Sequence, residues 1–267
     1  MNQMIRVLRF GVKAGFACPL GFLLAVMMSL LGSSIHSQEG PSRGLSSTQK
    51  TSLDTAEELM KAAKDAELKG DLHSAEAYCR RAMDTLRRAG FTPQGESFHL
   101  GSILYDSGRK TEGYALMKSA FSHPVAHVGM DTRLGLAAIE QKEPSVAKAI
   151  VDFYRRDDFG TGAIAVSTHV DWPKGDDDKT LKAMLLFLRA SWIYTQTREN
   201  DKAIGLLTEA NKLRPNNAAI LYLHARCLVE LKKYKESVPF FKFVMENATG
   251  KFGSYAKRRY QIYSSLD

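Results

Sequence analysis

The sequence predicts an all-α protein: a row of about five helical hairpins, followed by a C-terminal helix that caps the row. The first observation is that the stretch Met184–Val244 repeats its pattern after 34 residues, so that Phe187 aligns with Leu221 and Leu207 with Phe241. The second is that each copy contains two segments with apolar residues at helical spacing, separated by a short polar turn. The third is that small residues recur at matching positions of the two copies. Because two helices approach closely only where side chains are short, these small residues indicate closely paired helices.

The composition fits a folded protein that does not bind nucleic acid. Of the 267 residues, 44% are hydrophobic and 25% are charged, which supplies enough apolar material for a sizeable core. The net charge is +8, but Arg6, Arg9 and Lys13 lie in an N-terminal stretch without acidic residues. Without these three of the 37 basic residues, the chain has a net charge of only +5. This small excess, with no basic run interleaved with aromatic residues, argues against a nucleic-acid partner.

Residues 1–37 have the order of a secretory signal peptide: a basic start, the apolar run Leu20–Leu31, and then small and polar residues. The alternative is a membrane anchor that is retained. Extended back to Ala14, the run reaches 18 residues, but Gly15, Pro19 and Gly21 interrupt it, and spanning a bilayer takes about 20 apolar residues, so the cleaved signal is favoured. We therefore expect an exported protein, periplasmic or secreted, which touches a membrane only through this segment if the segment is retained.

Residues 38–53 are rich in Ser, Thr, Gly and Pro and contain hardly any apolar residue. Such a composition cannot bury enough apolar surface to fold, which predicts a disordered linker. The helical-repeat domain is then residues 54–267, and its first helix is expected to begin near Leu53.

The first repeat unit runs from Ala56 and carries small residues at Ala63, Ala75 and Ala82. Gly70-Asp71 separates its two helices, because glycine supplies the backbone freedom that ends a helix.

The second unit begins near Gln94, with Gly101 and Gly113 at the positions where its helices would be in close contact. The third begins near Val128 and departs from the pattern at Tyr154, where a small residue is expected. This departure predicts looser packing in the third hairpin.

Between the third and fourth units lie extra residues, 159–180, which interrupt the periodicity. Insertions in repeat arrays project as loops, often near a binding surface. Asp176–Asp178 could suggest a calcium site, but the ligand pattern and glycine of a calcium loop are missing. We interpret these residues as the start of the next helix, with Asp178 as its N-cap.

After the fifth unit, the C-terminal segment places Tyr255, Arg259, Ile262, Tyr263 and Leu266 on one helical face. This face is expected to cover the last repeat.

Export would leave two cysteines, Cys79 and Cys227, in the first and last hairpins. Repeats of such an array contact only their neighbours, so the two sulfurs are expected to lie beyond bridging distance. Both are interpreted as small packing residues.

No catalytic or cofactor-binding constellation stands out, so we expect no enzyme, no cofactor and no metal. His123 and His127 are four residues apart, but Pro124 intervenes and no third ligand is near. No serine or cysteine stands in a nucleophile motif.

The repeated pattern of residues 54–247, with small residues at 63, 75 and 82 and the Gly70-Asp71 turn, resembles the tetratricopeptide repeat family. The resemblance implies a right-handed superhelical solenoid in which the first helices of successive hairpins line a concave groove. It also implies a non-enzymatic scaffold that binds a partner protein or an extended peptide in this groove.

Carried over from the family by repeat position, the partner-binding groove residues include Lys64, Phe98, Tyr105, Leu188, Trp192, Tyr222 and Arg226. Trp192, Tyr222 and Arg226 are the preferred anchors, because Trp, Tyr and Arg dominate binding hot spots. The alternative for Trp192 and Tyr222 is that they fill space between adjacent hairpins.

Some family members bind C-terminal carboxylates with a Lys/Asn pair in their first repeats. This chain has Met60 and Lys64 at those positions, which disfavours that activity. A second hypothesis for the whole protein is a membrane-anchored envelope assembly factor that serves as a structural subunit of a membrane complex.

Overall fold

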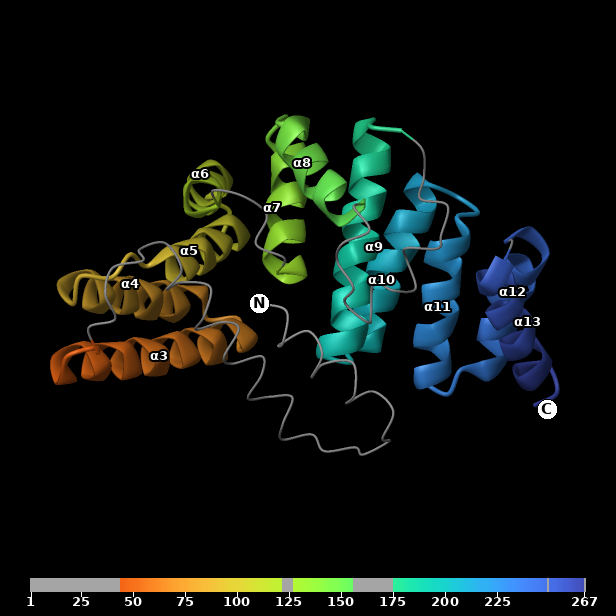
Figure 1. Ribbon diagram of the computed structural model, residues 1–267, viewed down its shortest axis with the longest axis horizontal. Coiled ribbons are helices and arrows are strands. Elements are labelled where there is room, and N and C mark those ends of the chain that lie inside the picture. The colour runs from red at the N-terminus through yellow and green to blue at the C-terminus, as the bar shows by residue number, and fades with distance from the viewer. Residues whose placement is uncertain (1–43, 122–126, 156–174, 249, 267) are drawn as a thin grey trace. The chain divides into compact units, whose positions relative to one another are not determined.

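The computed structural model describes residues 44–121, 127–155, 175–248 and 250–266, which form eleven helices, labelled α3 to α13 (Figure 1). The chain divides into two compact units, Met1–Thr51 and Ser52–Asp267. Of the first unit, only residues 44–51 are described. The predicted signal segment 1–37 therefore lies outside the described residues.

The second unit confirms the all-α prediction, because its helices follow one another as five hairpins and a final helix (Figure 1). The hairpins are α3 (Ser47–Leu68) with α4 (Leu72–Arg88), α5 (Gln94–Asp106) with α6 (Lys110–Ala120), α7 (Val128–Glu140) with α8 (Pro144–Arg155), α9 (Asp178–Gln196) with α10 (Asn200–Leu213), and α11 (Ala218–Glu230) with α12 (Tyr234–Asn247). Helix α13 (Gly250–Tyr263) follows the fifth hairpin.

Helix α3 begins earlier than the sequence predicted, so the last residues of the expected linker 38–53 are helical. The cause is a reciprocal cap at its start. The backbone N–H of Gln49 donates to the Ser46 hydroxyl at 3.2 Å, and the Ser46 N–H donates to the Gln49 side-chain oxygen at 3.1 Å. A Ser followed three residues later by Gln is a known helix-start signal, which composition alone does not reveal.

The turn inside every hairpin has the same backbone conformation, with one residue in the left-handed region. Gly70 and Gly108 occupy it in the first two hairpins, with φ of 78° and 92°. Lys142, Arg198 and Lys232 occupy it in the other three, with φ of 61°, 57° and 61°. Backbone hydrogen bonds hold each turn; the N–H of Lys232, for example, donates to the Val229 carbonyl at 2.9 Å. The turn therefore depends on backbone bonding and does not require glycine.

In the second hairpin, α5 and α6 approach each other backbone to backbone. A Cβ atom added to Gly113 would lie 2.5 Å from the Gly101 carbonyl oxygen and 2.5 Å from the Tyr105 nitrogen. Neither atom can move without moving a helix. The small residues predicted at positions 101 and 113 are therefore required at this crossing.

The third hairpin is not loosely packed, so that prediction was wrong. Tyr154 is 3% exposed, and its hydroxyl donates to the fully buried Asp131 carboxylate at 2.5 Å. Burial and the neighbouring carboxylate raise the pKa of Tyr154, which keeps the hydroxyl protonated as a donor. A large residue is accepted here because its polar end has a partner on α7.

Helix α9 is buried on two sides and joins two hydrophobic clusters. On one side, it packs against α7 and α8 through Leu181, Met184, Leu185 and Leu188. On the other side, it packs against α10 and α11 through Leu186, Phe187, Ala190 and Ile193. A helix that is apolar around most of its circumference belongs inside a core.

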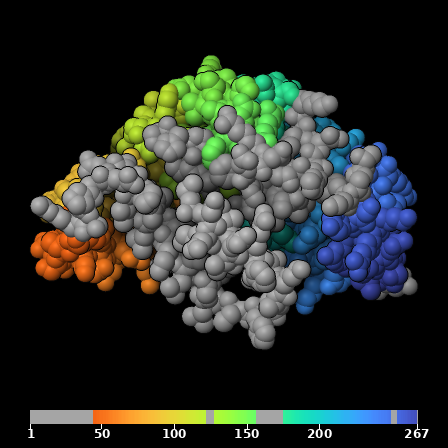
Figure 2. Space-filling view, viewed as in Figure 1, coloured from red at the N-terminus to blue at the C-terminus, as the bar shows by residue number. Residues whose placement is uncertain are grey.

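Helix α13 packs on α12 through buried residues of which only Tyr263 belongs to the predicted face. Its buried residues are Gly253, Ala256 and Tyr263, and the Tyr263 ring stacks on the Tyr234 ring at 5.4 Å between centroids. Tyr255, 59% exposed, and Ile262, 45% exposed, point outward. The prediction failed because both faces of this helix carry apolar residues. The last two helices form the blue surface in Figure 2.

Cys79 and Cys227 are free and buried, as predicted. Burial raises the pKa of each thiol to about 12, so neither is a reactive thiolate near neutral pH. Among the described helices, none is both long and apolar enough to cross a membrane.

We expect Gly113→Ala to lower the free energy of unfolding by about 1–3 kcal/mol or more, because the added methyl group forces two backbones apart. Gly205→Ala on α10 is the control, since no atom lies within 4 Å of its added Cβ. The control should gain about 0.5–1 kcal/mol from helix propensity. Urea unfolding measures both, and equal effects would contradict the close approach.

We expect Lys232→Gly to stabilise the fifth hairpin by about 0.5–1 kcal/mol, because glycine adopts the left-handed conformation without strain. The control, Lys242→Gly, changes an exposed lysine in the middle of α12. It should destabilise by about 0.5–1 kcal/mol. Thermal unfolding of the two variants should thus give shifts of opposite sign, and shifts of the same sign would refute the role of the turn.

Candidate partner-binding site

Three of the predicted groove residues are buried and cannot contact a partner in this structure. Phe98 is 3% exposed, Leu188 is 1% exposed and Tyr222 is 5% exposed. All three are fifth residues of their repeat units. Phe98 and Leu188 belong to the core around α5 to α9, and Tyr222 packs edge-on against the Phe241 ring at 5.8 Å. For these residues, the prediction of an accessible surface is corrected: they are packed in the core.

The remaining predicted residues are accessible. Lys64 is exposed on α3, whereas Tyr105 on α5, Trp192 on α9 and Arg226 on α11 are half-buried. They stand at the ninth or twelfth position of their units. Their role in binding stays a prediction, but their accessibility allows it.

Tyr105 is fixed by contacts with its neighbours. Its hydroxyl donates to the Glu140 carboxylate at the end of α7, at 2.5 Å. Lys110 donates to the same carboxylate at 2.9 Å, and its Nζ lies 5.5 Å from the Tyr105 ring centroid. Burial and the hydrogen bond to Glu140 raise the pKa of Tyr105. The side chain therefore links α5 to α7 and holds its ring in one orientation.

Trp192 packs against the start of α7. Its ring centroid lies 6.1 Å from that of His127, and a Cβ on Gly129 would lie 3.3 Å from the indole. His127 is the N-cap of α7, where its Nδ1 accepts a hydrogen bond from the Met130 N–H at 3.2 Å. Burial lowers the pKa of His127, which favours this neutral accepting form. His123, the other histidine of the rejected metal pair, lies outside the described residues.

Arg226 is held by an aromatic residue of the preceding hairpin. It donates to the Tyr194 hydroxyl at 2.6 Å, and its guanidinium carbon lies 5.4 Å from the Tyr194 ring centroid. The Tyr194 hydroxyl in turn donates to Glu230 at 3.4 Å. This arrangement orients the guanidinium between α9 and α11.

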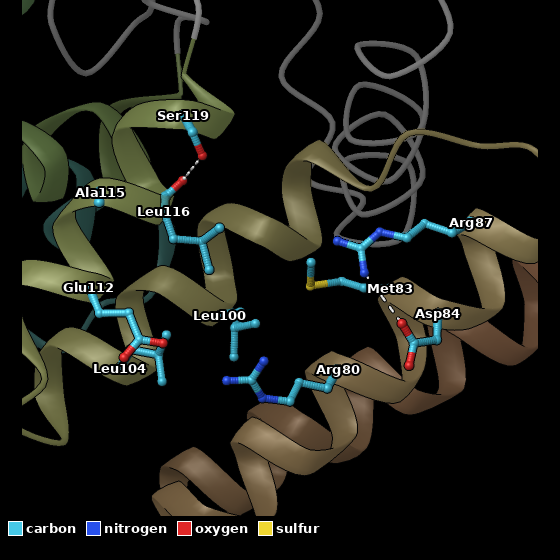
Figure 3. A pocket seen from close by; sticks show the side chains of 10 residues that line it. All are labelled: Arg80, Met83, Asp84, Arg87, Leu100, Leu104, Glu112, Ala115, Leu116 and Ser119. Carbon is cyan, nitrogen blue, oxygen red and sulfur yellow. Dashed lines mark hydrogen bonds and ion pairs between the residues drawn. The ribbon is translucent and has the colours of Figure 1, made fainter.

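A hollow that the sequence did not predict lies between α4, α5 and α6 (Figure 3). It has a volume of about 510 Å³. Its lining combines apolar residues with charged ones: Arg80, Met83, Asp84, Arg87, Leu100, Leu104, Glu112, Ala115, Leu116 and Ser119. Figure 3 shows Arg80 and Arg87 extending from α4 beside the apolar side chains.

The charges around this hollow already have partners. Arg80 pairs with Glu76 at 2.7 Å, Arg87 with Asp84 at 3.3 Å, and Glu112 with Arg109 at 2.7 Å. The hollow therefore offers no free charge for a ligand. The sequence analysis missed this hollow because three helices contribute its lining residues, and no local residue spacing indicates which helices come together.

The acidic residues just before α9 form ion pairs with basic residues on α8 and at the end of α10. Asp176 pairs with Lys148 at 3.1 Å and with Arg155 at 3.1 Å. Asp177 pairs with Arg214 and caps the helix, its carboxylate accepting from the Thr180 N–H at 3.1 Å. The N-cap is thus Asp177 and not Asp178. Within the described ranges, no three His, Cys, Asp or Glu residues gather as metal ligands.

We expect Asp176→Asn to destabilise the protein near neutral pH and to have no effect in acid. Hydrogen bonds from Lys148 and Arg155 lower the pKa of Asp176 below the unfolded value of about 3.9. Its stabilisation is therefore complete above the unfolded pKa and is lost as the pH falls through the folded pKa. Urea unfolding from neutral pH into acid measures the difference from wild type.

The control is Asp65→Asn, which removes an exposed carboxylate that has no ion pair within the described part of the chain. A difference between Asp176→Asn and wild type that stays constant into strong acid would show that the ion pairs contribute nothing.

Comparison with known proteins gives one family match. Residues 175–243 match the model described as anaphase-promoting complex, cyclosome, subunit 3. The matched range contains the fourth hairpin and most of the fifth, where the 34-residue repetition is clearest. No protein of curated function matches the sequence significantly.

Several solved structures are similar at low identity. YrrB, described as a TPR protein with an unusual peptide-binding site, is 11% identical; the match covers 80% of this chain and 100% of YrrB, with a TM-score of 0.36. TTC0263 of Thermus thermophilus, described as a thermophilic TPR protein, is 15% identical over 79% of this chain and 100% of its own, with a TM-score of 0.34. MamA of Desulfovibrio magneticus RS-1 is 14% identical over 76% and 96%, with a TM-score of 0.34.

These TM-scores are too low to carry an argument about how this chain works. The assignment of the fold rests on three findings: the repeat pattern of the sequence, the five hairpins that this pattern correctly predicted, and the family match over the fourth and fifth hairpins. Together they confirm the resemblance: the chain has a tetratricopeptide-like helical-repeat fold, which suggests a scaffold for protein–protein interaction.

Proposed function

We propose that this protein is an exported, non-enzymatic scaffold that binds an extended peptide or a partner protein along the first helices of its hairpins. The observation that carries the proposal is the placement of Lys64, Tyr105, Trp192 and Arg226. These side chains stand at the ninth or twelfth positions of the first, second, fourth and fifth units and are accessible, whereas the fifth-position residues of the second to fifth units are buried.

The chemistry of these residues supports binding. Trp, Tyr and Arg are the side chains most enriched in interface hot spots. Here three of them are already oriented: Tyr105 by Glu140, Trp192 by the start of α7, and Arg226 by Tyr194. Side chains that are fixed before binding lose less conformational entropy when a partner arrives.

The export part of the proposal rests on the sequence of residues 1–37, where a basic start is followed by an apolar run and small polar residues. N-terminal sequencing of the mature protein tests it. Cleavage between Gly32 and Gln38 would support export, and an intact N-terminus would point to a retained anchor and to assembly at a membrane.

The binding surface is tested by cross-linked capture of partners with the full chain, quantified by mass spectrometry. The variant Trp192→Ala/Arg226→Ala removes two accessible anchors and keeps the buried Tyr222. We expect it to lose a specific partner by roughly ten-fold or more, because hot-spot residues contribute at least about 2 kcal/mol each.

The matched control is Tyr255→Ala/Arg258→Ala, which removes an exposed aromatic residue and an exposed arginine from α13. It should capture the partner as wild type does. Equal capture by all three proteins would refute the first-helix surface, and loss in the control alone would move the binding surface to α13.

A further inference from the structure

The positive charge of the folded part of the chain is concentrated at its C-terminal end. Residues 38–215 contain 25 basic and 25 acidic residues, so this part of the sequence is neutral. Residues 216–267 contain nine basic and four acidic residues, which gives them a net charge of +5. Apart from the segment 1–37, the fifth hairpin and α13 therefore supply the whole positive excess of the protein.

Most of these C-terminal basic side chains have no counter-charge. Basic residues of the earlier hairpins often pair with a carboxylate, as Arg80, Arg109 and Arg155 do. Six residues of the C-terminal end are exposed and, among the residues that the structure describes, form neither an ion pair nor a side-chain hydrogen bond: Lys232, Lys233, Lys235, Lys242, Lys257 and Arg258.

Three of the lysines are close to the end of α13. Near that end, the Tyr263 ring stacks on the ring of Tyr234 at the start of α12, with 5.4 Å between centroids. Helices α12 and α13 therefore lie side by side and run in opposite directions (Figure 1). This places the end of α13 beside the turn between α11 and α12, which carries Lys232 and Lys233, and beside Lys235 in the first turn of α12.

Two exposed aliphatic side chains accompany these lysines. Ile262 on α13 is 45% exposed. Leu266, which follows the helix, is 44% exposed, and its backbone N–H donates to the Tyr263 carbonyl at 3.4 Å. The buried side of α13, with Ala256 and Tyr263, is turned toward α12. Ile262 and Leu266 thus present apolar surface to the outside, next to unpaired positive charge.

Lysine beside exposed aliphatic residues fits a lipid surface better than a folded protein. Protein interfaces are depleted in lysine, and fixing a long flexible side chain on binding costs entropy. Lipid headgroups diffuse within the membrane and can reach a lysine that is not held in one orientation. The accessible residues of the first helices are different, since hydrogen bonds hold Tyr105 and Arg226 in place.

We propose that a C-terminal patch, formed by Lys232, Lys233, Lys235, Ile262 and Leu266, docks this end of the array on a membrane that contains anionic lipid. The lysines contact the phosphate headgroups, and the two aliphatic side chains enter the boundary between headgroups and acyl chains. The inference goes beyond the proposed function, because it adds a peripheral membrane contact that depends neither on the first-helix surface nor on residues 1–37.

The test measures how strongly the full chain binds to vesicles in a flotation assay. Vesicles of phosphatidylcholine alone are compared with vesicles of phosphatidylcholine and phosphatidylglycerol in equal parts. The quantity of interest is the ratio of binding to anionic and to neutral vesicles, because the apolar run of residues 1–37 can bind both. We expect wild type to bind the anionic vesicles more strongly by roughly ten-fold or more, and added salt should reduce this preference.

The variant Lys232→Gln/Lys233→Gln/Lys235→Gln removes the charge of the C-terminal patch. It should lower the ratio of anionic to neutral binding by roughly ten-fold or more, because each basic residue near an anionic surface strengthens binding by up to about five-fold. All three side chains are exposed, so the helical circular-dichroism spectrum should stay unchanged. An unchanged ratio overturns the proposal.

The matched control is Lys61→Gln/Lys69→Gln/Lys212→Gln, which removes three exposed lysines from the first and fourth hairpins. It changes the net charge of the protein by the same amount and should bind vesicles as wild type does. An equal loss in both triple variants would mean that total charge, and not the C-terminal patch, determines binding, which also overturns the proposal.

A second pair of variants tests the apolar part of the patch. Ile262→Ser/Leu266→Ser should weaken binding to the anionic vesicles several-fold, because less apolar surface enters the membrane. Leu68→Ser changes an apolar residue that is 80% exposed at the end of α3 and should have no effect. If the double variant binds as wild type does, insertion of the aliphatic side chains is refuted and the patch as defined is wrong.

A protein with an acidic surface is the competing partner. If wild type binds anionic and neutral vesicles equally, while the variant without the three patch lysines loses a protein in cross-linked capture, the patch docks an acidic protein and the lipid proposal is overturned. Trp192 and Arg226 are intact in all of these variants. Failure of this inference therefore leaves the first-helix surface untouched, and failure of that surface leaves the vesicle result untouched.

Discussion

The fold depends on the burial of helix α9 from two sides. Its leucines and Met184 complete the cluster with α7 and α8, and Phe187, Ala190 and Ile193 complete the cluster with α10 and α11. In a repeat array, each hairpin is stabilised mainly by its neighbours, so a helix that serves both neighbours couples the two ends. The same helix carries Trp192, which is half-buried and remains accessible.

Periodicity predicted the hairpins well because it reports which residues share a helical face. It could not predict how wide the buried part of that face is. Phe98, Leu188 and Tyr222 were expected to face a groove, yet they are buried, because neighbouring helices pack closely enough to cover the fifth position in the second to fifth units. The ninth and twelfth positions remain accessible, except for Ser102 at the ninth position of the second unit, which is 5% exposed.

Other differences arise from hydrogen bonds between residues far apart in the sequence. Tyr154 is too large for its position by the repeat pattern, and it fits because its hydroxyl reaches Asp131 on the facing helix. The start of α3 is a different case: Ser46 and Gln49 are local, and the capping signal was readable.

The shared turn has a consequence for how such a chain can grow. Each hairpin closes with one left-handed residue held by backbone hydrogen bonds, and a glycine, a lysine or an arginine can occupy that place. A duplicated stretch of gene that encodes one hairpin would therefore also encode the turn that connects its two helices. The array can change in length by whole hairpins while the conformation of the turns stays the same. Each new hairpin can afterwards diverge in sequence at its accessible positions.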